Sequence, residues 1–172
     1  LKCAVRLQSS VSGMNRAASG RQPISVSIGI DSGKLAVGAL GDSVRLDGAI
    51  LSDCIRCALK FETAARVFGA RILINGAVFA GLSEPLAWFL RPVDRIETDG
   101  ITSFLFEVYN NDSDTVRDLK WKTQGDLERA VFAYFGDDSE TAKRHLSVVL
   151  QTFPDDPVAR HYAQRLQMAV SI

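Results

Sequence analysis

The sequence is short of cysteines and has no long hydrophobic run. Its 172 residues contain three cysteines, an odd number that lacks the spacing of a disulfide framework and fits a reducing compartment. Uninterrupted apolar stretches, such as Gly76 to Leu82, are much shorter than the roughly 18 to 20 residues that cross a bilayer. We therefore expect a cytoplasmic location and no transmembrane segment in this chain.

Excess charge of one sign is absent as well. Twenty Lys and Arg residues balance twenty Asp and Glu residues, so neither nucleic acid nor an anionic membrane surface is expected as a partner. Apolar residues make up 47% of the chain, which is enough to form a hydrophobic core. At about 150 residues per domain, the length fits one domain with a remainder.

Most familiar catalytic signatures are missing. The sequence has no hydrolase nucleophile elbow, no phosphate-binding loop and no zinc-ligand spacing. His145 and His161 fall in helical patterns without a nucleophile beside them, which is typical of surface or interhelix residues. Cys54 and Cys57 form a C-x-x-C pair inside a helical pattern, with no second pair nearby, so we expect neither a redox nor a zinc role.

The first two thirds of the chain alternate between helical and strand patterns. Helical spacing predicts an amphipathic helix over residues 1–19 and a second helix from Ala49 to Phe68. Alternating apolar residues predict strands over 24–30 and 34–40, which the intervening Asp-Ser-Gly turn would join into a β-hairpin. Further elements are expected as strands at 71–74, 86–96 and 104–108, and as a small helix or turn at 75–82.

The last third has a different character. A polar linker, Asn110 to Asp114, precedes a segment with helical patterns only, from about residue 123 to residue 170. A helix start near Ser139 and a stop at Pro154 divide this segment into three helices. We therefore divide the chain into a first domain at 1–112 and a helical tail at 113–172.

Four blocks of the first domain carry a family resemblance. They are V-S-I-G-I-D-S-G-K-L-A-V-G-A-L-G (Val26 to Gly41), G-A-I-L-S-D-C-I-R-C-A-L-K-F-E (Gly48 to Glu62), G-A-R-I-L-I (Gly69 to Ile74) and F-L-R-P-V-D-R-I-E-T-D-G-I-T-S-F-L-F-E-V-Y (Phe89 to Tyr109). In this order they resemble the catalytic domain of class III adenylate and guanylate cyclases. The resemblance implies an α+β fold with a ferredoxin-like, mostly antiparallel sheet that is covered by helices at one face.

The resemblance also implies a chemistry. The family joins the 3′ oxygen of a nucleotide to its α-phosphate and expels pyrophosphate, with two carboxylates that hold Mg²⁺ or Mn²⁺. In the family these carboxylates lie on the first strand and the following hairpin, which precede the helix that begins here at Leu1. We therefore expect a sheet without its first strand or strands, no metal ligands in this chain, and a chain that is a fragment of a longer protein.

The substrate-binding positions depart from the family pattern. The second helix of the family carries an Asn and, four residues later, an Arg, where this sequence has Arg56 and Lys60. Lys60 keeps a positive charge but loses the planar guanidinium that binds phosphate through two parallel hydrogen bonds. The base-selecting position falls on Ala49, which has no donor or acceptor, and the neighbouring family position falls on Asp53, which is more typical of a surface or capping residue.

One further departure concerns the triphosphate. The family offers a Lys beside a Gly before the last strand, but this sequence has Asp99 there, whose charge would repel phosphate. The loss of one charge-stabilising group typically lowers a rate by about 10² to 10³. Several losses in one site, together with the missing metal carboxylates, predict a degenerate domain without useful cyclase activity.

The tail has a weaker resemblance of its own. Phe132 to Asp156 resembles a tetratricopeptide-type helical hairpin, of which the chain covers little more than one repeat. A single repeat cannot bury both of its faces, so we expect the tail to pack on the cyclase-like domain or on a partner.

Two functions remain open from the sequence. The first is a regulatory or dimerising interaction module on a cyclase scaffold, paired with a second cyclase-type domain, since an incomplete sheet leaves backbone groups to be covered. The second is the C-terminal part of an active adenylate or guanylate cyclase whose metal ligands lie outside this sequence. Arg56 and Lys60 favour the first function, and Ala49 argues against a nucleotide sensor.

Overall fold

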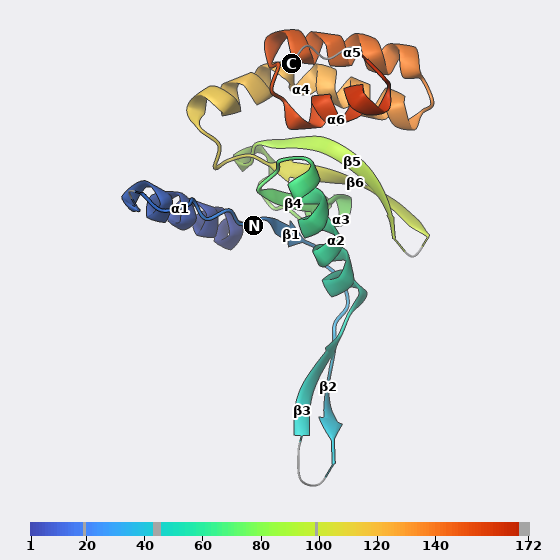
Figure 1. Cartoon of the computed structure of the whole chain (residues 1–172). Coiled ribbons are helices and arrows are strands. Elements are labelled where there is room, and N and C mark those ends of the chain that lie inside the picture. Colours follow the sequence, from blue (N-terminus) through green and yellow to red (C-terminus); the bar gives the residue numbers. More distant parts are fainter. Residues whose placement is uncertain (19, 43–45, 99, 169–172) are drawn as a thin grey trace.

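The computed structural model describes residues 1–18, 20–42, 46–98 and 100–168 (Figure 1). The elements in chain order are α1 (Lys2–Ala17), β1 (Ile28–Ile30), β2 (Ala36–Gly41), β3 (Leu46–Leu51), α2 (Asp53–Val67), β4 (Ile72–Asn75), α3 (Gly76–Ala80), the 3-10 helix η1 (Pro85–Ala87), β5 (Leu90–Thr98), β6 (Ile101–Val108), α4 (Asp114–Phe135), α5 (Ser139–Thr152) and α6 (Pro157–Arg165). The predicted mixture of a sheet with helices, followed by a helical tail, is confirmed.

The central sheet has four strands in the order β1-β4-β6-β5. β1 pairs with β4 in parallel, whereas β4 with β6 and β6 with β5 are antiparallel. A bulge interrupts the β5 ladder between Pro92 and Asp94, where the missing N–H of proline is tolerated because β5 is an edge strand of the described sheet. The sheet is therefore mostly antiparallel, as expected.

Helices cover both faces of this sheet, so the expectation of a single covered face is wrong. Leu73, Val93 and Leu105 pack on one face against α2 and the tail helices. Ile72 and Ile74 point to the other face, where α1, α3 and the start of β5 supply apolar neighbours. The physical reason lies in β4, whose first three residues are all apolar and buried and therefore need cover on both sides.

A close approach between β1 and α2 fixes the first of these faces. A Cβ atom built on Gly29 would lie 2.1 Å from the carbonyl oxygen of Ala58 and 2.6 Å from the backbone nitrogen of Glu62. Only a residue without a side chain allows α2 to lie this close to β1. The glycine of the V-S-I-G-I block is therefore a packing residue.

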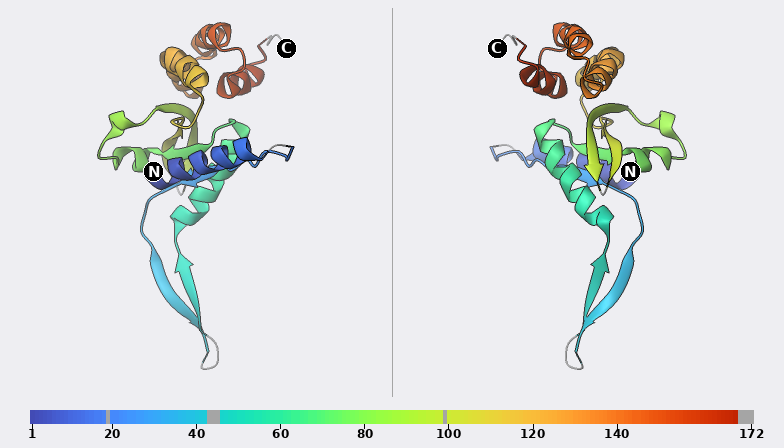
Figure 2. Two further views of the ribbon diagram at one scale, coloured as in Figure 1. Left: turned by 90° about the vertical axis from the view of Figure 1, so that its left-hand side faces the viewer. Right: turned by 90° about the vertical axis from the view of Figure 1, so that its right-hand side faces the viewer.

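The β-hairpin expected from residues 24–30 and 34–40 is wrong. β1 pairs with β4, and β2 pairs instead with β3 to form a two-stranded ribbon, which we call the arm. Figures 1 and 2 show the arm projecting away from the four-stranded sheet. Alternating apolar residues indicate a strand but do not specify which strand it pairs with.

The second helix begins later than expected. Residues 49–51 belong to β3, and α2 starts at Asp53 after Ser52, whose hydroxyl oxygen accepts a hydrogen bond from the Cys54 N–H. The apolar Ile50 and Leu51 suit a strand as well as a helix, so Ser52 was the informative residue as an N-cap.

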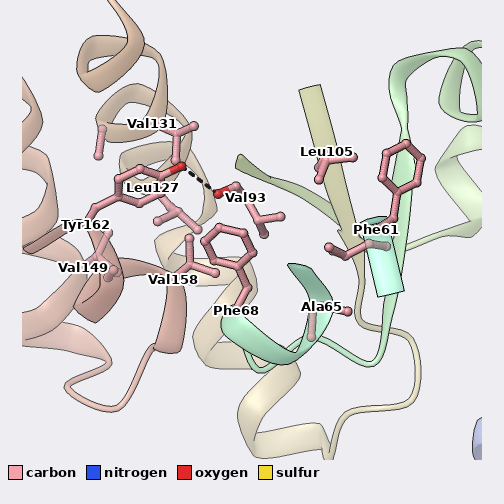
Figure 3. Close-up of a cluster of buried hydrophobic side chains, with 14 of the residues drawn as sticks. Phe61, Ala65, Phe68, Val93, Leu105, Leu127, Val131, Val149, Val158 and Tyr162 are labelled. Carbon is pink, nitrogen blue, oxygen red and sulfur yellow. Dashed lines mark hydrogen bonds between the residues drawn. The ribbon is translucent and has the colours of Figure 1, made fainter. Parts of the chain in front are cut away.

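The tail forms three helices that pack on the sheet, as expected. The first of them, α4, begins at Asp114, earlier than the predicted start near residue 123. Tyr162 on α6 donates its hydroxyl hydrogen to the Val93 carbonyl at 3.0 Å (Figure 3). Figure 3 shows Phe61 of α2 and Phe68, the C-cap of α2, in the same apolar cluster as Leu127 of α4. One hydrophobic core therefore spans the sheet and the tail.

A buried set of charges accompanies this core. Arg91 on β5 donates to Glu107 on β6 at 2.6 Å and to Asp156, the N-cap of α6, at 2.5 Å. Lys120 on α4 donates to Glu107 at 2.6 Å and to Asp112 at 2.5 Å. We call these five residues the sheet–tail junction.

The charges of the junction act on each other's protonation. Burial alone would raise the pKa of Glu107, but the nearby charges of Arg91 and Lys120 and their hydrogen bonds outweigh it. The pKa of Glu107 is held below its ordinary value. Glu107 is therefore ionised at neutral pH and neutralised by two cations.

Candidate functional site

The cations expected on the second helix lie on the exposed side of α2. Arg56 and Lys60 are one helical turn apart, a spacing that predicts a shared helix face, and the structure shows that both are exposed. Arg56 Nη2 donates to Asp53 Oδ1 at 2.7 Å, and the two side chains are 60% and 79% exposed. The Arg56 charge is thus already balanced by a carboxylate of its own helix.

Lys60 has a different environment. It is exposed and makes no hydrogen bond or ion pair with any residue that the structure describes. Of the two cations, Arg56 lines a cavity, whereas Lys60 lines none of the described cavities. The structure therefore brings the two residues to one helix face without enclosing them in one site.

The cavity at Arg56 lies where the arm joins α2. It is an open hollow of about 490 Å³ lined by Lys34, Leu35, Ala36, Ser52, Asp53 and Arg56. The Ser52 hydroxyl donates to the Lys34 carbonyl at 2.7 Å, which holds the start of the arm against the start of the helix. We call these six residues the arm base.

A second cavity, of about 510 Å³, lies on the other side of Lys34 and Asp53. Its polar lining includes Asp31 at the end of β1 and Asn75 at the end of β4, and its apolar lining includes Phe61. Asn75 Nδ2 donates to Asp31 Oδ1 at 2.7 Å across the carboxyl ends of the two parallel strands. Sequence analysis missed both polar residues, although their position directly after buried strands was a usable signal.

The polar groups of this cavity mainly hold the chain together. Asp31 Oδ1 also accepts from the Ser32 N–H at 2.7 Å, and Asn75 Oδ1 accepts from the Val78 N–H at 3.0 Å. Ser103 Oγ accepts from the Gly76 N–H at 3.0 Å. These contacts fix the start of α3 against β1 and β6, so the cavity is preformed.

The potential metal ligands among the described residues form no cluster of three or more. Across residues 1–18, 20–42, 46–98 and 100–168, no three His, Cys, Asp or Glu side chains gather where they could hold a metal ion. Asp31 and Asp53 line one cavity but are bound to Asn75 and Arg56 respectively. The C-x-x-C pair places Cys54 at the cavity and Cys57 beneath it, again without a third ligand among the described residues.

The structure describes only one of the two other expected site residues. Ala49 belongs to β3 of the arm, where its backbone pairs with that of Gly38, and not to the second helix as the sequence predicted. Asp99 lies outside the described residues. The expected roles of both residues in base and phosphate recognition stay predictions.

Two sequence relatives of this chain are named adenylate cyclases. The chain is 33% identical over 82 residues to an adenylate cyclase of Anabaena cylindrica, a match that covers 48% of this chain and 16% of the relative. It is 23% identical over 168 residues to the terminal-differentiation specific adenylate cyclase of Dictyostelium discoideum, covering 96% of this chain and 8% of the relative. No family model matches the sequence.

Among solved structures, the chain resembles that of a bacterial light-regulated adenylyl cyclase. The TM-score is 0.54 at 16% sequence identity, over 67% of this chain and 34% of that chain. In the part of the chain that the structure describes, no helix has both the length and the apolar character needed to cross a membrane. The sequence relatives and the shared fold together show a class III cyclase-like domain in this chain.

Proposed function

We propose that this chain does not turn over nucleoside triphosphates by itself and acts as a regulatory or dimerising module built on a cyclase scaffold. The observation that carries the proposal is the Arg56–Asp53 pair at the arm base. Its 2.7 Å hydrogen bond neutralises the cation that stands at a family substrate position. A phosphate that approached Arg56 would also meet the Asp53 carboxylate.

The second cation supports the same conclusion. Lys60 presents a single ammonium group, whereas the family arginine offers two parallel donors to one phosphate. In the family, metal ions assist the attacking hydroxyl and neutralise the charge of the triphosphate, and the described residues of this chain form no cluster of three or more potential metal ligands. Each loss of a charge-stabilising group lowers a rate by about 10² to 10³, and several such losses together would leave little turnover.

The arm supports a dimerising role. Leu35, Val37 and Ile50 are 55%, 71% and 57% exposed, although all three are large and apolar. An isolated two-stranded ribbon is at best marginally stable in water, so a second protein surface is expected to cover the arm. A second cyclase-type domain, in a homodimer or a heterodimer, is the partner that the fold suggests.

The proposed lack of cyclase activity is tested with the purified chain, Mg²⁺ or Mn²⁺, and ATP or GTP. We expect no cyclic nucleotide above the level of a sample without protein. A characterised cyclase assayed in parallel shows that the conditions allow turnover. Cyclic nucleotide well above background would contradict the proposal.

The proposed dimerisation is tested by sedimentation of the chain and two variants. We expect Val37→Glu, which places a charge on the arm, to shift the chain toward monomer. Val148→Glu is the matched control, because Val148 is also an exposed apolar residue, 42% accessible, but lies on α5. An unchanged sedimentation coefficient for Val37→Glu would argue against dimerisation through the arm.

The second candidate function is a part of an active adenylate or guanylate cyclase. It is supported by the two relatives named adenylate cyclase, of which the matched segments form 16% and 8%. A heterodimer could then combine this chain with metal ligands from another domain. In that case, adding the chain to a cyclase domain that carries both metal carboxylates raises the cyclization rate, and Arg56→Ala reduces the gain.

A further inference from the structure

An aromatic groove lies on the side of the molecule where β5 forms the edge of the sheet. Its volume is about 410 Å³, and its lining comes from α3, η1, the start of β5, β6 and one face of α4. None of its lining residues belongs to the arm base, so it is a separate surface. It also contains both tryptophans of the chain, Trp88 and Trp121.

Large apolar side chains are exposed around this groove. Leu86 is 100% exposed, Trp121 is 64% exposed and Phe79 is 37% exposed. Ring contacts hold the walls in place: Phe89 packs edge-on against Trp121 at 6.0 Å, and Phe79 stacks on Phe106 at 4.9 Å. A contiguous apolar surface with fixed walls is typical of a binding site for a partner's side chain.

Helix α4 gives the groove a polar rim with a negative charge. Trp121, Gln124 and Glu128 are spaced three and four residues apart, which places them on one helix face. Gln124 Oε1 accepts from the Tyr109 hydroxyl at 2.9 Å, and this bond orients the amide group. Glu128 makes no hydrogen bond or ion pair with a described residue, so its carboxylate is available to an incoming cation.

Two arginines of α4 near the groove are already paired with carboxylates. Arg117 donates to Asp114 at 2.5 Å, and its guanidinium carbon lies 5.3 Å from the centre of the Phe89 ring. Arg129 lies 3.8 Å from Asp126. The Arg117 contact shows that the aromatic wall accepts a cation, while Glu128 remains the lining residue with an uncompensated charge.

The edge of β5 limits how a partner can bind. The Phe89 carbonyl accepts a hydrogen bond from the Tyr109 N–H at 3.0 Å, so the backbone groups of Phe89 face inward. In an antiparallel pair, successive residues direct their N–H and C=O groups to opposite sides, so those of Leu90 face the open edge. Two residues later Pro92 has no N–H to offer. The edge therefore supports one backbone contact but not a long added strand, and the groove favours a short segment held by its side chains.

We propose that this groove binds a short peptide segment of a partner protein in which an aromatic or branched aliphatic anchor residue stands next to a lysine or arginine. The anchor enters between Trp121 and Leu86, and the cation pairs with Glu128. The proposal concerns a different surface from the arm base and stands apart from whether the chain has cyclase activity.

The test uses the intrinsic tryptophan fluorescence of the full chain, because both tryptophans line the groove. The probes are two capped peptides without tryptophan, acetyl-Gly-Phe-Lys-Lys-Gly-amide and acetyl-Gly-Phe-Gln-Gln-Gly-amide. We expect a saturable change with the basic peptide and at least about fivefold weaker binding of the neutral one, from the loss of the ion pair and the cation–ring contact.

Two variants locate the effect. Glu128→Gln is expected to remove the preference for the basic peptide, and Trp121→Ala is expected to weaken both peptides, with Trp88 as the remaining reporter. Asp118→Asn is the matched control, because Asp118 is an exposed carboxylate of α4 that does not line the groove. Equal affinity for the two peptides, no saturable change, or an unchanged preference in Glu128→Gln would overturn the proposal.

Discussion

The sheet–tail junction and the arm base both pair cations with carboxylates, but they do so in opposite surroundings. In the junction, Arg91 and Glu107 are buried, and each binds two partners from different elements. At the arm base, Arg56 and Asp53 are mostly exposed and belong to the same helix. The junction therefore holds the fold together, whereas the arm base can change its residues without loss of the fold.

This contrast explains how a cyclase-like fold can persist when exposed residues of α2 change. Substitutions at exposed positions of α2 change what the surface binds, and exposed ion pairs contribute little to stability. The junction joins β5 and β6 to the tail and contains no residue of α2. We therefore expect substitutions in the junction to affect stability strongly and substitutions at the arm base to affect it little.

The largest effect is expected in the junction. Arg91→Met leaves Glu107 with one cation instead of two and Asp156 with none of its bonds to Arg91, and both carboxylates stay buried. Breaking a buried pair in this way costs about 3 to 5 kcal/mol. Urea unfolding followed by circular dichroism measures the loss.

The control for this variant is Arg66→Met on α2. Arg66 pairs with Glu62 at 2.6 Å but is 71% exposed, so its removal should cost less than about 1 kcal/mol. Similar losses for the two variants would mean that burial does not separate the two kinds of pair.

The next effect concerns the contact of β1 with α2. Gly29→Ala places a methyl group 2.1 Å from the Ala58 carbonyl oxygen, and a backbone atom cannot rotate away. Overpacking of this kind costs about 1 to 3 kcal/mol, measured by the midpoint of urea unfolding. Gly38→Ala in the arm is the matched control, because its Cβ meets no atom within 4 Å. An unchanged midpoint for Gly29→Ala would contradict the close approach.

Acid should weaken the junction in a graded way. The pKa of Glu107 is lowered in the folded chain, so its contribution to stability is present above the ordinary glutamate pKa of about 4.3 and is lost as the pH falls below it. The loss should be smaller than that of Arg91→Met, because protonation leaves the carboxyl group in place. Thermal unfolding between pH 7 and pH 3 measures it, and Glu107→Gln should show a shallower dependence on pH.

Much of the local structure could be predicted from the sequence. The last two helices of the tail and the strand at Ile72–Asn75 follow from apolar spacing and from capping residues within a few positions, whereas α4 begins well before its predicted start. The hairpin prediction failed because β1 pairs with β4, which lies beyond the arm and α2 in the chain. Local patterns predict that a strand exists, but its partner depends on which distant strand shares its buried face.

In the sites, too, local features could be predicted from the sequence and most long-range contacts could not. The spacing of Arg56 and Lys60 was sufficient to place both on one face of α2, and the structure shows that this face is exposed. The junction was not predictable, because Arg91 binds partners 16 and 65 residues away. The contact of Asp31 with Asn75 joins residues 44 positions apart, and here the ends of two buried strands gave a signal that could have been used.

The smallest effect on stability is expected at the arm base, where the two partners of one ion pair should differ in their contributions. Asp53 lies in the first turn of α2, where a negative charge interacts favourably with the N-terminal end of the helix by about 0.3 to 1 kcal/mol. Arg56 is close to the same end, where a positive charge gains nothing from the helix. Asp53→Asn should therefore lower the urea midpoint slightly more than Arg56→Ala, although both variants remove the same 2.7 Å pair. Equal shifts would assign the whole effect to the pair itself, and a shift as large as that of Arg91→Met would mean that the arm base carries the fold as the junction does.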